Sequence, residues 1–202
     1  MKAVFLDRDG VINELIYYPE QGIIDSPFLP EQLRLFPGVG ASICKFHELS
    51  YKVILVSNQP GIAKGYFTEE MFERIKEKMK AELGREDAFL DEEYYCLHHP
   101  EAKVASLRKN CECRKPKPGM LLEAARKLNI NLSQSWMIGD GITDIQAGKA
   151  AGCKTILIGR MKCELCQLMD DMAARPDHIA LNLYEASRII AQEEVHFHED
   201  IY

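Results

Sequence analysis

The stretch Val4-Phe5-Leu6-Asp7-Arg8-Asp9-Gly10 places two carboxylates one residue apart at the end of a short apolar run. Such a run is typical of a buried strand, and an open α/β sheet carries its chemistry where such strands end. Asp7 and Asp9 would lie on the same side of an extended chain. The pair can therefore supply a nucleophile, a proton donor and a ligand for a divalent cation. For an isolated D-x-D pattern, a strand-end turn with solvated acids is the more common interpretation.

The rest of the chain alternates between strand and helix patterns. Short apolar runs predict buried strands at 3–6, 52–56, 94–97, 136–138 and 155–158. Apolar residues three and four apart predict helices at 39–49, 68–83, 120–128 and 144–151, with Thr68 as an N-cap and Gly152 as a C-cap. This alternation predicts an α/β fold with a doubly wound, Rossmann-like parallel sheet and helices on both faces. We expect residues 1–202 to form a single domain, without a large cap domain in the loops 13–37 and 98–116.

Composition excludes several classes of protein. The 202 residues are 47% hydrophobic, which suffices for one well-packed domain. The formal net charge of -6 provides no basic field for a nucleic acid, although local cations could hold a small phosphorylated metabolite. No apolar run approaches membrane-spanning length, and seven cysteines, an odd number, argue against a secreted disulfide framework. We therefore expect a cytoplasmic monomer that binds neither nucleic acid nor membrane.

Three further segments supply partners for the two aspartates. Ser57, Asn58 and Gln59 follow a predicted strand, where a hydroxyl and amides can bind phosphate oxygens, although such residues more often only form a turn. Arg114 and Lys115 stand in a proline-stiffened loop before a helix. A basic loop is more often a solvated surface, but rigid cations before a helix N-terminus favour anion binding.

The last of these segments, Gly139-Asp140-Gly141-Ile142-Thr143-Asp144, again brings an acid to a strand end. Asp140 can complete an oxygen-ligand Mg²⁺ site with Asp7.

Cysteine and histidine are grouped around the loop 98–116. Cys96-Leu97-His98 precedes it and Cys111-Glu112-Cys113 lies near its end, so three thiols and one imidazole form a full tetrahedral ligand set for Zn²⁺. Buried free cysteines and a surface histidine are the alternative interpretation. Because the loop contains few apolar residues, a structural Zn²⁺ would supply order that packing cannot. It would also direct the cations that follow Cys113.

The order D-x-D, S-N, Lys before a helix, and G-D-x-x-x-D resembles the haloacid dehalogenase superfamily over about the first four-fifths of the chain. The resemblance implies a phosphatase in which Asp7 attacks phosphorus and Asp9 acts as general acid and base. Ser57 and Lys115 would bind the transferring phosphoryl group. Mg²⁺ would be held by Asp7, Asp140 and the backbone carbonyl of Asp9, with Asp144 orienting its neighbours.

The thiol pattern and the turn 57–65 resemble a zinc-containing, capless branch of that superfamily, which includes heptose 1,7-bisphosphate and histidinol-phosphate phosphatases. The resemblance implies a phosphatase that acts on a small sugar phosphate, and removal of the 7-phosphate of D-glycero-D-manno-heptose 1,7-bisphosphate is the main hypothesis. Hydrolysis of histidinol phosphate is the alternative. Arg114 would hold the non-reacting phosphate, and Arg8, Asn58 and Gln59 would complete the substrate site. A polynucleotide 3'-phosphatase would require a basic groove, and an inactive binding protein would require a broken D-x-D.

Two positions depart from this branch. The loop 13–37, which helps to bind sugar in the heptose enzymes, looks longer here, and Gly141 replaces a lysine that commonly touches substrate phosphate. One substrate contact is therefore missing or supplied elsewhere. Cys163 and Cys166 could bind metal or form a disulfide, but one face of an ordinary helix is the simpler interpretation.

Overall fold

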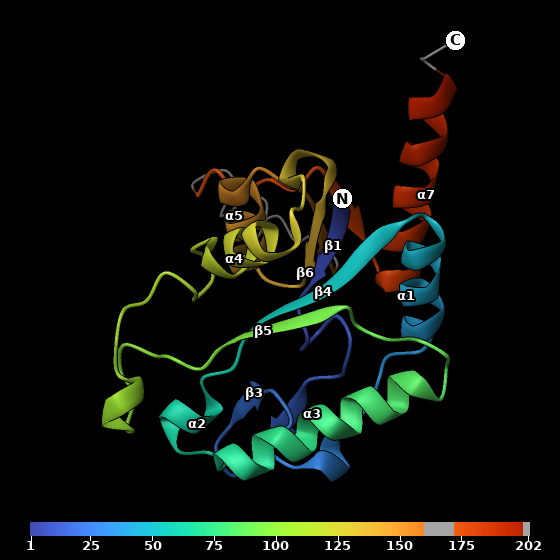
Figure 1. Cartoon of the computed structure of the whole chain (residues 1–202). Helices are drawn as coiled ribbons and strands as arrows, with labels where there is room; N and C mark the ends of the chain where they lie inside the picture. The colour runs from blue at the N-terminus through green and yellow to red at the C-terminus, as the bar shows by residue number, and fades with distance from the viewer. Residues whose placement is uncertain (160–171, 200–202) are drawn as a thin grey trace.

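The computed structural model describes residues 1–159 and 172–199, and Cys163 and Cys166 lie outside this part of the chain. Its centre is a parallel sheet of six strands in the order β5-β4-β1-β6-β7-β8 (Figure 1). The strands are β1 (Lys2–Leu6), β4 (Tyr51–Asn58), β5 (Glu92–Cys96), β6 (Trp136–Gly139), β7 (Lys154–Ile158) and β8 (His178–Ala180). The sequence prediction of a doubly wound α/β fold is thereby confirmed.

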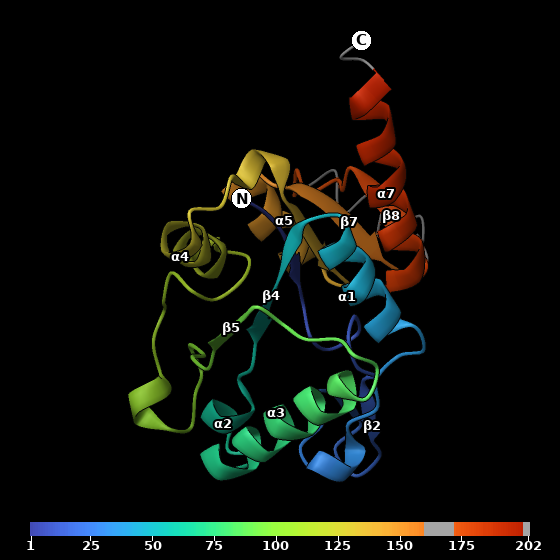
Figure 2. The same cartoon turned by 45° about the vertical axis from the view of Figure 1, so that its right-hand side comes forward.

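Helices cover both faces of the sheet, as Figures 1 and 2 show from two directions. Those described are α1 (Val39–Glu48), α2 (Gly61–Lys64), α3 (Glu69–Gly84), α4 (Gly119–Leu128), α5 (Ile142–Ala151) and α7 (Leu183–Glu199). Alternation along β1 divides the core: Val4 and Leu6 pack with α1, α3 and α7, whereas Ala3 and Phe5 pack with α4 and α5. Hydrophobic burial on both faces thus fixes the register of the central strand.

The strand order reverses at β1. The chain runs outward from β1 to β4 and β5, then crosses back to β6, β7 and β8 on the other side. Ligands of open α/β sheets bind in the crevice at the carboxyl ends of the strands at such a point. The ends of β1, β4 and β6 meet there, and each is followed by one of the polar segments singled out in the sequence.

The predicted helix ends are close to the observed ones. Thr68 caps α3, its hydroxyl oxygen accepting a hydrogen bond from the Met71 amide at 3.2 Å, and Gly152 ends α5 in the left-handed conformation. The sequence interpretation missed β8, helices α2 and α7, and a hairpin of β2 (Ile16–Tyr18) and β3 (Ile23–Asp25) within the loop 13–37. Each missed strand has three residues, too short for a periodic pattern to stand out.

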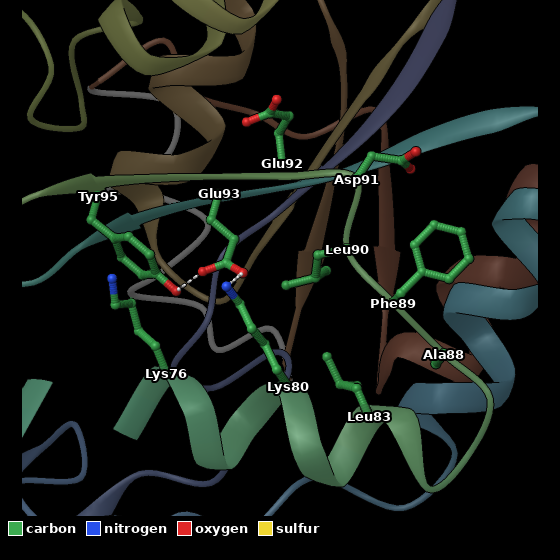
Figure 3. A pocket seen from close by; sticks show the side chains of 10 residues that line it. All are labelled: Lys76, Lys80, Leu83, Ala88, Phe89, Leu90, Asp91, Glu92, Glu93 and Tyr95. Atoms are coloured by element: carbon green, nitrogen blue, oxygen red, sulfur yellow. Dashed lines mark hydrogen bonds and ion pairs between the residues drawn. The ribbon is translucent and has the colours of Figure 1, made fainter. Parts of the chain in front are cut away.

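A cavity of about 580 Å³ lies between α3 and the edge strand β5, and none of the residues that directly follow β1, β4 or β6 lines it. Figure 3 shows Lys80 and Glu93 facing each other, with the Glu93 carboxylate bound to Lys80 at 2.8 Å and to the Tyr95 hydroxyl at 3.0 Å. Within the cavity, Lys80 thus compensates the charge of Glu93. Among the described residues, no helix is long and apolar enough to span a membrane.

Candidate active site

A buried lysine stands at the centre of the site. Lys115 is 2% exposed, and its ammonium lies 3.0 Å from Asp7 Oδ1 and 2.6 Å from Asp144 Oδ1 while donating to the Val56 carbonyl at 2.8 Å. Burial by itself would lower the pKa of Lys115, but the charges of Asp144 and Asp7 outweigh it and raise that pKa above its usual value. Lys115 therefore remains a cation beside Asp7, at the end of β1.

Three carboxylates surround this lysine. Oxygens of Asp7, Asp140 and Asp144 all lie within 4.8 Å of one another. Partial desolvation and the charges of Asp7 and Asp144 raise the pKa of Asp140 to about 7, although this residue reaches solvent. Burial raises the pKa of Asp144 to about 6 against the opposing effect of Lys115. This all-oxygen donor set, with more acids than cations, fits Mg²⁺.

Close backbone approach shapes this cluster. Gly10 has a φ of +79°, and a Cβ placed there would lie 2.0 Å from Asp140 Oδ2. Only glycine combines this left-handed backbone with the space that the carboxylate needs. The glycine that ends the first acidic motif therefore lets the loop after β1 pass against the loop after β6.

Asp9 is held apart from the carboxylate cluster by three side chains. Arg8 donates to both of its carboxylate oxygens at 3.2 Å, Asn13 donates to Oδ1 at 2.9 Å, and Gln59 donates to Oδ2 at 2.5 Å. Arg8 itself is fully buried, with its guanidinium over the Phe72 ring. Its role as a substrate ligand stays a prediction. Asn13, four residues after Asp9, carried no motif in the sequence and was missed.

The carboxyl end of β4 contributes in two ways. Ser57 is buried near the strand end and its oxygen accepts a hydrogen bond from Gln59 at 3.0 Å. The Asn58 amide bonds the backbone of Lys115 twice, donating to its carbonyl and accepting from its N–H, each at 3.0 Å. Asn58, predicted to bind substrate, thus fixes the backbone that carries the buried lysine.

The cysteine and histidine side chains converge as predicted. Cys96 ends β5, and its sulfur lies 3.2 Å from that of Cys113 and 3.5 Å from that of Cys111, while His98 Nδ1 lies 3.3 Å from the Cys113 sulfur. All four donor atoms are within 4.8 Å of one another. Burial and the Lys109 charge lower the pKa of His98, which favours the neutral imidazole that binds metals. The S₃N donor set fits a closed tetrahedral Zn²⁺ site.

Arg114 follows this cluster directly and remains half-buried. Its guanidinium donates to the His98 carbonyl at 3.3 Å. Burial and the charges of Arg114 and Lys64 lower the pKa of His99. Two cations therefore lie close to this imidazole, and Lys64, at the end of α2, was not singled out in the sequence.

The chain resembles characterised phosphatases over most of its length. It is 41% identical over 160 residues to D-glycero-beta-D-manno-heptose-1,7-bisphosphate 7-phosphatase of Yersinia pestis, covering 78% of this chain and 80% of that protein. The Escherichia coli (strain K12) enzyme of the same name is 39% identical over 160 residues, which are 78% of each chain. This chain belongs to that phosphatase family.

Family and fold comparisons agree with this membership. A HAD-hydrolase-like family model matches residues 112–186. The structure of D,D-heptose 1,7-bisphosphate phosphatase from B. bronchiseptica, complexed with magnesium and phosphate, is 28% identical, with a TM-score of 0.76 over 96% of this chain and 99% of that chain. The predicted superfamily, the phosphatase class and the family resemblance are confirmed.

Proposed function

We propose that this protein is a Mg²⁺-dependent phosphatase that removes the 7-phosphate of D-glycero-D-manno-heptose 1,7-bisphosphate. The observation that carries the proposal is the contact of Lys115 with Asp7 and Asp144 at the end of the central strand, with Asp140 beside them. This arrangement joins a carboxylate nucleophile, a fixed cation and an oxygen donor set, which phosphoryl transfer requires. The activity of the relatives supports the same substrate.

The chain's own residues account for both half-reactions. Asp7 attacks phosphorus, the bond from phosphorus to the sugar oxygen breaks, and the protonated Asp9 carboxyl gives its proton to that oxygen. Asp9 then takes a proton from water, which attacks the aspartyl phosphate and releases phosphate and Asp7. Ser57 and Lys115 hold the phosphoryl oxygens in both steps. Arg8 and Gln59 bind the Asp9 carboxylate and Asn58 binds the Lys115 backbone, so these three residues support the proposed site through its other members.

Two metals complete the proposed enzyme. Asp7, Asp140 and the Asp9 carbonyl would hold Mg²⁺, which neutralises charge on the transferring group. Cys96, His98, Cys111 and Cys113 would hold a structural Zn²⁺, since their four donors leave no open position. The magnesium in the B. bronchiseptica enzyme supports the first assignment.

Arg114 selects the substrate in this proposal. Lys115 is committed to the reacting phosphoryl group, so the half-buried Arg114 can grip a second phosphate with its planar fork. Histidinol phosphate, the second candidate, carries a cationic amine that Arg114 would repel unless an acid such as Glu14 or Asp25 intervened.

A substrate panel tests the proposal. We expect kcat/KM to be highest for heptose 1,7-bisphosphate, lower for the heptose monophosphates and lowest for histidinol phosphate. Equal efficiency on mono- and bisphosphates would contradict the assignment and leave a general sugar-phosphate phosphatase. Analysis of the product by ³¹P NMR shows which phosphate is released.

We also infer a single-domain monomer in the cytoplasm. Three clustered thiols remain metal ligands only while they are reduced, as they are in the cytosol. Sedimentation of the purified protein tests the monomer, and fractionation of the cells that make it tests the location.

A further inference from the structure

The side chain of Gln59 lies between two groups of the proposed reaction without itself opening to the substrate crevice. It is 1% exposed and contacts Asp9, Ser57 and Arg8. A buried amide with this many polar contacts has one orientation, because each of its groups must meet a matching partner. Gln59 is therefore fixed more tightly than a surface turn residue would be.

The orientation of the amide follows from its neighbours. Nε2 donates to Asp9 Oδ2 at 2.5 Å and to the Ser57 oxygen at 3.0 Å, while Oε1 accepts from Arg8 Nη2 at 2.8 Å. Turning the amide over would place its oxygen against a carboxylate and its NH₂ against a guanidinium. Since Ser57 accepts the hydrogen bond, its own hydroxyl proton stays available for a phosphoryl oxygen.

Arg8 closes a ring with Gln59 around Asp9. Its guanidinium contacts both oxygens of Asp9 and the oxygen of Gln59 while its face lies over the Phe72 ring. Because the Arg8 side chain is fully buried, leaving this position would place its charge in the core without the Asp9 carboxylate that compensates it. The ring therefore restrains the rotation of the Asp9 carboxylate from its buried side.

We propose that Gln59 is a positioning residue that aims the Asp9 carboxyl group at the leaving oxygen and uses Ser57 and Arg8 as its anchors. This inference rests on the proposed phosphatase chemistry. It assigns Gln59 a role in proton transfer, in place of the direct substrate contact that the sequence suggested. General acid catalysis depends on such placement and contributes about 10²- to 10⁴-fold to a rate.

The leaving group distinguishes this role from others. A sugar alkoxide needs a proton as it departs, whereas p-nitrophenolate is stable enough to leave without one. The kcat/KM of each ester reports the steps up to the formation of the aspartyl phosphate. A residue that acts through Asp9 must therefore affect the sugar phosphate far more than p-nitrophenyl phosphate.

The experiment compares Gln59→Met, which keeps the side-chain length and removes the amide, with wild-type protein on both esters. We expect kcat/KM to fall about 100-fold for heptose 1,7-bisphosphate and less than about 3-fold for p-nitrophenyl phosphate. Asp9→Asn should show the same pattern with a larger loss, whereas Ser57→Ala should lower both values alike. Gln134→Met, the same exchange at an exposed position outside the site, should change neither.

The alternatives give different results. Equal losses on both esters in Gln59→Met would overturn the inference and leave Gln59 as a support of the phosphoryl site, and no loss on either would overturn it as well. If Gln59→Met fails to fold, Gln59→Asn, one methylene too short to keep the three contacts, must show the same difference between esters. A wild-type protein that hydrolyses neither ester would overturn the proposed function and this inference together.

Discussion

The carboxylate cluster and the thiol cluster both begin at the end of a strand, but different forces hold them together. Asp7 and Asp140 follow the central strands β1 and β6, whose hydrogen bonds and buried side chains fix both positions. In the thiol cluster only Cys96 belongs to the sheet, and the other three donors stand in the irregular segment 98–113. The first cluster is thus positioned by paired strands, whereas most of the second is positioned by a loop.

Charge balance distinguishes the clusters further. Lys115 compensates part of the negative charge of Asp7 and Asp144 from a buried position. Burial raises the pKa of Cys96, because removal from water disfavours the charged thiolate. The hydrogen bond with Cys113 lowers that pKa, but by less than burial raises it. The carboxylate cluster is therefore partly neutralised by its own lysine, whereas the four donors of the thiol cluster include no lysine or arginine.

The largest expected effect follows from altering the carboxylate cluster. Asp7→Asn should lower turnover about 10⁴-fold or more, because an amide cannot attack phosphorus. The amide oxygen can still accept the hydrogen bonds of Arg8 and Lys115, so the fold should survive. Steady-state kinetics measures the loss, and circular dichroism checks the fold. Near wild-type activity in a folded variant would exclude the aspartyl-phosphate mechanism.

A change in the thiol cluster should lower activity indirectly, through loss of the metal that orders the loop. We expect elemental analysis to find zinc in wild-type protein purified without added metal and none in Cys113→Ser. Because Arg114 and Lys115 follow directly, kcat/KM should fall about 100-fold through their displacement. Cys44→Ser, at a half-buried cysteine outside both clusters, is the matched control. Zinc retained in Cys113→Ser, or absent from the wild type, would refute the ligand set.

A variant at the junction of the two clusters should affect selectivity alone. Arg114→Ala removes a charge-assisted contact worth about 2 kcal/mol, so the preference for bisphosphate over monophosphate should fall about 30-fold. The kcat/KM for the monophosphate should stay within a factor of about 3. Arg114→Lys, which keeps the charge without the bidentate fork, should retain only part of the preference. An unchanged ratio in Arg114→Ala would assign the second phosphate to another cation.

The smallest effect is expected far from both clusters. Thr68→Ala removes the N-cap of α3 and should lower the free energy of unfolding by about 1 kcal/mol. Activity at 25 °C should not change, since Thr68 touches neither cluster. Urea denaturation measures the stability difference. A loss of activity without a loss of stability would show that α3 takes part in the site.

The sequence predicted those parts of the molecule whose structure depends mainly on residues close together in the chain. Buried strands such as β1 and β4 are recognisable because a short apolar run indicates a buried strand. Cys96 and Cys113 are recognisable because they belong to cysteine pairs with the spacing of metal ligands. Arg8 could not be placed in this way. Successive side chains of an extended segment point to opposite sides, so the residue between Asp7 and Asp9 turns into the core, where Gln59 and Phe72 receive it.

The contacts of Asp144 were also beyond sequence reasoning. The Asp144 carboxylate was expected to orient its neighbours. Its distance of 2.6 Å from Lys115, however, depends on where the loop 98–116 places that lysine. Asn58 illustrates the same limit, since its two bonds to the Lys115 backbone join the end of β4 to the loop before α4. Such contacts follow from tertiary geometry, which a local pattern does not contain.

The central position of β1 also sets the order in which the enzyme can be assembled during its synthesis. β1 pairs with β4 on one side and with β6 on the other, so it has both partners only after residue 139 has been made. Parallel pairings over such separations form slowly, because a long loop must close before any contact compensates for it. The growing chain therefore carries Asp7, the proposed nucleophile, without a complete site until β6 has been made, although Asp7 precedes every other member of that site.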